Sequence, residues 1–249
     1  MAAAPVVPSS PDPGTPSAGL SQTARVIDTF IAPKKTFLDI RRSAQWWMPF
    51  VLITIVSTIL VFVAEQKIGV DKLVANDLHA RPKQEAQFEK LTSEQQAGQI
   101  KVSGVIYYIA FPVITLLIWL IMAGLQFATF KFGANADITY GRSLAVVAYS
   151  GLPMTLRGVL AIIAVAAGAS ADGFTLNNPI ASNPGFFMDP PNNPFLYVIA
   201  SQLDVFLLWT IALTAIGFAI VGKVKTATSF AIVIGWWLVI TLLFAFLSK

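Results

Sequence analysis

Long apolar runs alternate with short polar stretches over most of this chain. At about 1.5 Å per residue, a helix of roughly 20 apolar residues crosses the ~30 Å hydrocarbon layer of a bilayer. Five runs are long enough: residues 46–64, 105–130, 143–168, 194–221 and 229–248. The pattern therefore predicts an all-α integral membrane protein with five transmembrane helices, which together form a membrane domain over residues 44–249.

The segment before the first run has a different pattern. Residues 1–22 are mostly Ala, Pro, Ser and Gly, a composition that buries too little apolar surface to order itself, so we predict a disordered tail. In residues 23–43, apolar side chains such as Phe30, Ile31 and Phe37 recur at helical spacing around Pro33, with Lys and Arg between them. This pattern is typical of amphipathic helices that lie in the membrane interface. The same face could instead pack against the ends of the spans.

The polar segment at residues 65–104 separates the first two spans. Its six acidic and six basic residues, together with many Gln and Ala, favour one or two surface helices around Pro82. It also contains His79, the only histidine of the chain. A zinc site needs several ligands, so we interpret His79 as a solvated side chain.

Composition supports the membrane class and excludes several chemistries. Hydrophobic residues make up 55% of the chain and charged residues only 12%, about half the charged fraction of a soluble domain. The net charge of +4 comes from residues that flank the apolar runs, so we expect no nucleic-acid partner. With no cysteine, thiolate nucleophiles and cysteine metal sites are impossible. We predict no catalytic residue, metal or cofactor.

The distribution of Lys and Arg predicts the orientation. We leave aside the polar segment at residues 65–104, because its acidic and basic residues cancel. Nine of the other Lys and Arg residues lie before the first span and in the two short turns after the second and fourth spans. The loop after the third span and the C-terminus hold only Lys249. The positive-inside rule then puts the N-terminus in the cytoplasm and the C-terminus outside. In a prokaryote, the membrane would be the plasma (inner) membrane.

Two charged residues interrupt the apolar runs. If residues 194–221 form one helix, Asp204 lies about 15 Å from its start, where a carboxylate costs about 2.5–3.5 kcal/mol. Arg157 lies near the middle of the third span, and the predicted depths of the two residues, about 20 and 14 Å, allow contact. We therefore predict a buried pair between Arg157 and Asp204.

Four further positions support this candidate site. Pro153 breaks the third span because it removes the backbone hydrogen bond to Tyr149. The carbonyl groups freed there need other partners or a polar cavity. Gln202 and Trp209 are the polar and aromatic neighbours of Asp204 in the fourth span, and Gly235 is predicted to break the fifth.

Short motifs give the chain a resemblance to a known family. They are Ala148-Tyr149-Ser150-Gly151-Leu152-Pro153, Leu203-Asp204-Val205-Phe206 followed by Trp209, and Gly235-Trp236, with Phe30, Pro33, Phe37 and Ile40 before the first span. Over residues 30–247 the chain resembles the Ypt-interacting-protein (Yip) family, in its prokaryotic branch. The resemblance implies a cytoplasmic N-terminal region and five helices. In eukaryotic members it also implies contact with Rab-type GTPases and roles in vesicle traffic. The eukaryotic signature Asp-Leu-Tyr-Gly-Pro is replaced here by Trp46-Trp47-Met48-Pro49, which argues against a Rab-type partner.

Two functions remain open at this point. The first is a non-enzymatic membrane scaffold that binds lipid, other membrane proteins or further copies of itself, in membrane organisation or trafficking. The second is a transporter or channel for a small solute or ion, which would use Arg157 and Asp204. An intramembrane hydrolase is disfavoured because Asp204 has no second intramembrane carboxylate to work with.

Overall fold

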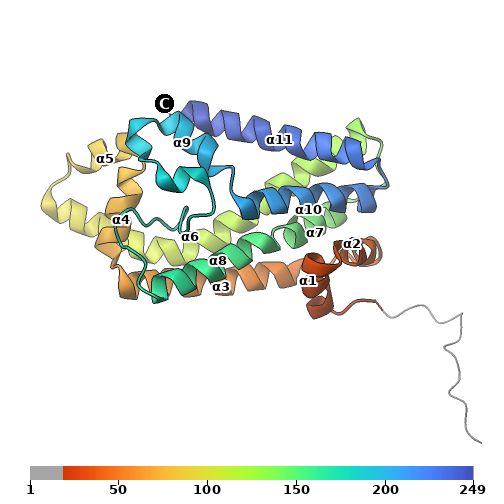
Figure 1. Cartoon of the computed structure of the whole chain (residues 1–249), viewed down its shortest axis with the longest axis horizontal. Coiled ribbons are helices and arrows are strands. Elements are labelled where there is room, and N and C mark those ends of the chain that lie inside the picture. The colour runs from red at the N-terminus through yellow and green to blue at the C-terminus, as the bar shows by residue number, and fades with distance from the viewer. Residues whose placement is uncertain (1–18, 249) are drawn as a thin grey trace, which may run out of the picture.

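The computed structural model describes residues 19–248. Most of the predicted N-terminal tail, residues 1–18, lies outside the described residues. The described part is an elongated bundle of helices whose axes run roughly along its length (Figure 1). Five helical segments are long and apolar enough to cross a membrane: Trp47–Lys67, Ser93–Gly133, Tyr140–Ala166, Val205–Gly222 and Thr226–Leu247. The predicted fold class, an all-α protein with five transmembrane helices, is confirmed.

Two short helices pack against one end of the bundle. α1 (Gln22–Ile31) begins at Ser21, whose hydroxyl accepts from the Ala24 N–H, and α2 (Pro33–Arg42) begins at the predicted breaker. Phe37 and Ile40 of α2 are fully buried in a core with α7 (Tyr140–Ser150) and α10 (Val205–Gly222). Phe37 is therefore unavailable to lipid, and for this side chain the alternative of packing against the ends of the spans applies. The exposed apolar residues of these helices are Ile27, Ile31 and Leu38.

The opposite end carries the polar segments. After α3 (Trp47–Lys67), the predicted polar loop forms α4 (Val70–His79), α5 (Pro82–Phe88) and the first turns of α6 (Ser93–Ala128). The loop after α8 (Leu152–Ala166) lies beside α4 at this end (Figure 1), where Lys72 Nζ contacts Asp172 Oδ1 at 2.6 Å. This contact lowers the pKa of Asp172. Two 3₁₀ turns, Pro184–Phe187 and Pro190–Asn192, and α9 (Pro194–Ser201) complete the end.

The predicted fourth span is two helices. The single helix expected over residues 194–221 is wrong: α9 ends at Ser201, and α10 starts only at Val205. Asp204 is the N-cap of α10, and its carboxylate accepts from the backbone N–H groups of Phe206 and Leu207. A side-chain carboxylate that accepts these N–H groups replaces the backbone carbonyls that would accept them in a continuous helix. The spanning part is thus 18 residues, about 27 Å, and Asp204 lies at its end rather than inside it.

The third span is interrupted at a glycine, whereas the fifth span is not. The third consists of α7 and α8, separated at Gly151. A Cβ on Gly151 would lie 3.3 Å from the Trp119 ring, so this break packs against α6 instead of lining a cavity. In contrast, α11 (Thr226–Leu247) runs through Gly235 without interruption, and the predicted break there is wrong. An isolated glycine weakens a helix by only about 1 kcal/mol.

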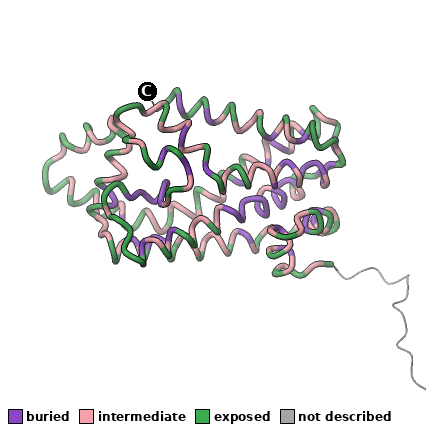
Figure 2. Tube along the Cα trace, viewed as in Figure 1, coloured by how far each residue is buried: buried purple, intermediate pink, exposed green. Residues whose placement is uncertain are grey.

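Burial is unequal along the bundle. Seven of the 11 residues of α7 are buried, including Val146 and Tyr149, and Figure 2 shows this dense region continuing into α10. In the most apolar 18 residues of α6 and the π-helical turn Thr129–Gly133 that follows it, only 6% of the residues are buried. The exposed residues of this segment are mostly apolar, such as Ile109 and Leu117. This composition is that of a helix surrounded by lipid.

Candidate functional site

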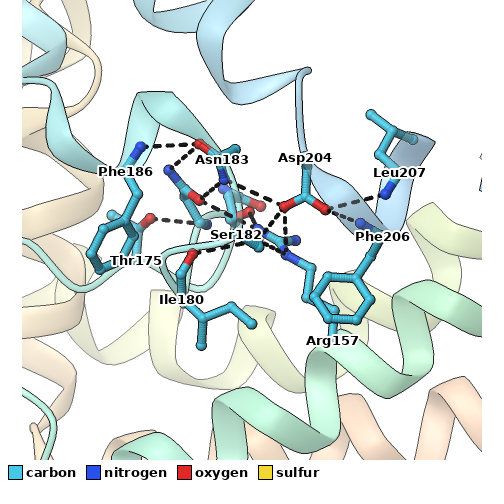
Figure 3. A network of polar contacts seen from close by, with 11 residues as sticks. Arg157, Thr175, Ile180, Ser182, Asn183, Phe186, Asp204, Phe206 and Leu207 are labelled. Carbon is cyan, nitrogen blue, oxygen red and sulfur yellow. Dashed lines mark hydrogen bonds and ion pairs between the residues drawn. The ribbon is translucent and has the colours of Figure 1, made fainter. Parts of the chain in front are cut away.

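Asp204 lies at the centre of a polar network formed by α8, the loop before α9 and the start of α10 (Figure 3). Its Oδ1 accepts the backbone N–H groups of Phe206 at 2.9 Å and Leu207 at 3.1 Å. Its Oδ2 accepts the hydroxyl of Ser182 and, at 3.4 Å, the amide of Asn183. Both carboxylate oxygens are therefore occupied, and Asp204 is only 2% exposed.

Arg157 from α8 completes the network. Its Nε lies 3.2 Å from Asp204 Oδ2, so the structure brings together the two residues that were expected to pair. One terminal nitrogen, Nη2, donates to the Asn177 carbonyl at 3.1 Å and contacts Asn178 Oδ1 at 3.4 Å. The Arg157 side chain is 12% exposed, against 3% for that of Asp204. The pair is thus desolvated on the Asp204 side and partly open on the Arg157 side.

The loop between α8 and α9 is held by its own side chains. Asn183 donates to Asn178 Oδ1 at 2.7 Å, and its own Oδ1 accepts the Phe186 N–H at 3.0 Å. The Ser182 carbonyl accepts the Val205 N–H at 3.1 Å. Because the first N–H groups of a helix need partners outside it, the loop and Asp204 together complete the start of α10.

Ser182, Asn178 and Asn183 were not predicted as site residues. In the sequence, this loop differs from its surroundings only by its many Asn, Pro and Gly residues. Asn is common in turns because its side chain bonds nearby backbone groups. The available signal was therefore an Asn cluster, without any sign that it would meet Asp204.

A cavity of about 830 Å³ opens beside this network. Arg157, Asn178, Gln202 and Asp204 line its polar part. Arg81, between α4 and α5, also lines it, and the hydrogen bond from Arg81 to Asp77 raises the pKa of the guanidinium. Gln202, which ends α9, is thus placed with the ion pair.

The other predicted positions lie away from this cavity. Tyr149 is fully buried, and its hydroxyl donates to Gln22 of α1 at 2.5 Å. The Trp209 ring packs edge-on against Phe30 of α1, with 5.6 Å between centroids. Pro153 is buried in the first turn of α8. Tyr149 and Trp209 therefore join α1 to the spans instead of supporting Asp204.

A second buried ion pair lies at the α1–α2 end. Arg25 Nε donates to Asp39 Oδ2 at 2.6 Å, and Arg25 Nη1 donates to the Gln45 carbonyl at 3.3 Å. Arg25 is only 1% exposed. This arginine belongs to the segment predicted to be amphipathic, but its side chain is buried because Asp39 lies on the facing side of α2. Arg42 also contacts Asp39, at 2.8 Å.

These observations define a multi-span helical membrane protein held together by two buried ion pairs. Among residues 19–248, no group of three His, Cys, Asp or Glu side chains could hold a metal ion. The chain belongs to the Yip1 domain family, whose model matches residues 27–247. The resemblance inferred from the motifs is thereby confirmed, and the family is one of non-catalytic membrane proteins. No curated protein and no solved structure matches the chain.

Proposed function

We propose that this protein is a non-enzymatic membrane scaffold that binds partners in membrane organisation or trafficking. The observation that carries this proposal is the saturation of Asp204, which accepts four hydrogen bonds and one ion pair from three segments. A carboxylate has about four acceptor positions, and those of Asp204 are occupied by groups of the protein, which leaves little capacity to bind an ion or accept a proton. A carboxylate used to join α8, α10 and the preceding loop gives a rigid surface instead.

Charge supports an orientation for this scaffold. The α1–α2 end includes the basic turns at Lys131 to Arg142 and Lys223 to Lys225 (Figure 1). By the positive-inside rule this end faces the cytoplasm, and the α4–α5 end and the C-terminus lie outside. A C-terminal reporter active only in the cytoplasm should be silent, and the same reporter at the N-terminus should be active. The reverse result would contradict this orientation.

The scaffold proposal is tested by partner capture in intact membranes. A photo-crosslinking residue at exposed Ile109 or Leu117 of α6 should give a discrete protein adduct, or a homodimer, that recurs between preparations. A matched probe at buried Ala123 of the same helix should give none. If the α6 probes crosslink only to lipid, and probes at Ile27 and Ile31 of α1 do the same, the scaffold proposal fails.

Transport is the second candidate function, and one observation favours it: the 830 Å³ cavity beside Arg157. Flux into liposomes that contain the purified protein tests this candidate. The matched control is the double variant Arg157→Gln/Asp204→Asn, which removes both charges together. Solute-dependent flux that disappears in this variant would favour transport over the scaffold.

A further inference from the structure

The cavity at the α4–α5 end has two chemical faces. Its inner wall carries the donors Arg157 and Gln202, whereas Met154, Phe244 and Leu247 form an apolar wall. Phe244 and Leu247 belong to the last turns of α11 and are 58% and 67% exposed. Because α11 is a spanning helix, the apolar wall continues directly into a surface that contacts the bilayer.

One hydrogen-bond donor group on the inner wall remains unused. The Arg157 guanidinium donates through Nε and Nη2, and within residues 19–248 its Nη1 meets no acceptor. A guanidinium matches the geometry of phosphate oxygens and commonly binds them with two parallel hydrogen bonds.

The charge balance of the lining residues favours an anion. Asp204 neutralises Arg157, and Asp77 neutralises Arg81. Lys83 is the third basic residue of the wall. It is exposed and makes no ion pair with any described residue. One positive charge therefore remains at the mouth of a cavity whose inner wall still offers donors.

We propose that this cavity binds the phosphate headgroup of an anionic glycerophospholipid. Arg157 Nη1 donates to the phosphate oxygens, Lys83 supplies the balancing charge, and the acyl chains follow Phe244 and Leu247 out into the bilayer. The cavity volume of about 830 Å³ lies in the range of sites that hold ligands of several hundred daltons. A lipid site of this kind is compatible with both a scaffold and a transporter. The proposal therefore does not depend on which of these functions the protein has.

The experiment measures lipid retention by native mass spectrometry of the full chain in a neutral detergent. Phosphatidylglycerol is titrated against phosphatidylcholine with the same acyl chains, and glycerol 3-phosphate serves as the water-soluble phosphate ester. We expect saturable binding of one phosphatidylglycerol and weaker binding of phosphatidylcholine. Glycerol 3-phosphate should not bind at the same concentrations, because it cannot use the apolar wall.

Two substitutions locate the site. Lys83→Gln should weaken phosphatidylglycerol binding about fivefold, the effect of one basic residue near an anionic lipid. Lys90→Gln is the matched control, since Lys90 is an exposed lysine of the same connection that does not line the cavity. Phe244→Ala should weaken lipid binding without a change in the folded yield, because this side chain is largely exposed.

Three outcomes would overturn the proposal. Lys83→Gln and Lys90→Gln could bind the lipid equally well, which would remove the cavity as the site. Phosphatidylcholine could bind as tightly as phosphatidylglycerol, which would show that charge is not recognised. Glycerol 3-phosphate could bind as tightly as the lipid, which would replace the lipid by a soluble phosphate ester.

Discussion

The two buried ion pairs stabilise different regions of the molecule in different ways. Arg25 and Asp39 are 14 residues apart and join two consecutive short helices. Arg157 and Asp204 join segments on either side of a long loop, and their contact also includes Ser182. Asp39 has a second cation, Arg42, whereas Arg157 is the only cation that contacts Asp204 in the described part of the chain. The first pair therefore tolerates the loss of one member better than the second.

The largest expected effect breaks the second pair. Asp204→Asn or Arg157→Gln alone leaves one charge buried without its partner. Each should cost about 3–5 kcal/mol by analogy with buried pairs in soluble proteins. Asp204→Asn keeps a side-chain oxygen for the α10 N-cap, so Asp204→Ala should lose about 1 kcal/mol more. Folded yield and thermal unfolding in detergent measure these losses.

The double variant Arg157→Gln/Asp204→Asn is the control for that prediction. It leaves two neutral amides that can bond each other and should recover much of the folded yield. If both single variants are as stable as the parent protein, the pair contributes no stability, and the cavity beside Arg157 supplies enough water to solvate it.

A smaller loss is expected when the first pair is broken. Arg25→Gln leaves Asp39 with Arg42 and with the Leu20 N–H, which donates at 3.3 Å. We expect a loss of about 1.5–3 kcal/mol, the range for a hydrogen bond to a charged group. Hydrogen exchange should increase in residues 22–42 and stay unchanged in α8. If the variant increased hydrogen exchange equally in residues 22–42 and in α8, then α1 and α2 would not be a separate unit.

Gly217→Ala tests the packing of α2 on α10 without changing a charge. A Cβ at Gly217 would lie 2.7 Å from Val146 Cγ1 and 2.8 Å from Phe37 Cε1. Overpacking of this kind costs about 1–3 kcal/mol, and the thermal midpoint should fall. Gly235→Ala is the matched control, because no atom lies within 4 Å of its Cβ position. That variant should be neutral or slightly more stable, since alanine favours helix.

The smallest effect is expected at the surface pair of Lys223 and Asp137. Lys223 Nζ donates to Asp137 Oδ2 at 2.9 Å, and this hydrogen bond lowers the pKa of the Asp137 carboxyl. A lowered carboxyl pKa stabilises the folded state above the ordinary pKa of about 4, and that stability is lost as the pH falls through the lowered value. Because both side chains are exposed, Lys223→Gln should leave the thermal midpoint at pH 7 unchanged. A clear drop in the thermal midpoint would show that this exposed ion pair does contribute to stability at pH 7.

The spans could be predicted from the sequence because roughly 20 apolar residues in a bilayer have few alternatives to a helix. The break before α10 could not be predicted in the same way. No Gly or Pro marks residues 202–204, and the helix starts at Asp204 because its carboxylate caps the next turn while Ser182 accepts the Val205 N–H. That arrangement depends on a loop more than 20 residues earlier.

Helical periodicity predicts which face of a helix is apolar. It does not predict whether protein or lipid covers that face. It correctly marked Phe37 as belonging to the apolar side of a short helix, but the bundle, and not the membrane, covers that side. Similarly, nothing near Arg25 in the sequence indicates Asp39 as its buried partner. Neither contact can be predicted from the pattern, because contacts between segments are long-range, whereas the pattern is local.

The close contact of Arg157 with Asp204 also has an electrical consequence. A transmembrane potential does work only on net charge, about 2.3 kcal/mol per elementary charge for each 100 mV crossed. The two side chains lie 3.2 Å apart and carry opposite charges, so a movement of both together takes almost no energy from the voltage. Asp204→Asn would leave the positive charge of Arg157 on α8 without its partner, and the energy of a movement of α8 would then depend on the membrane potential.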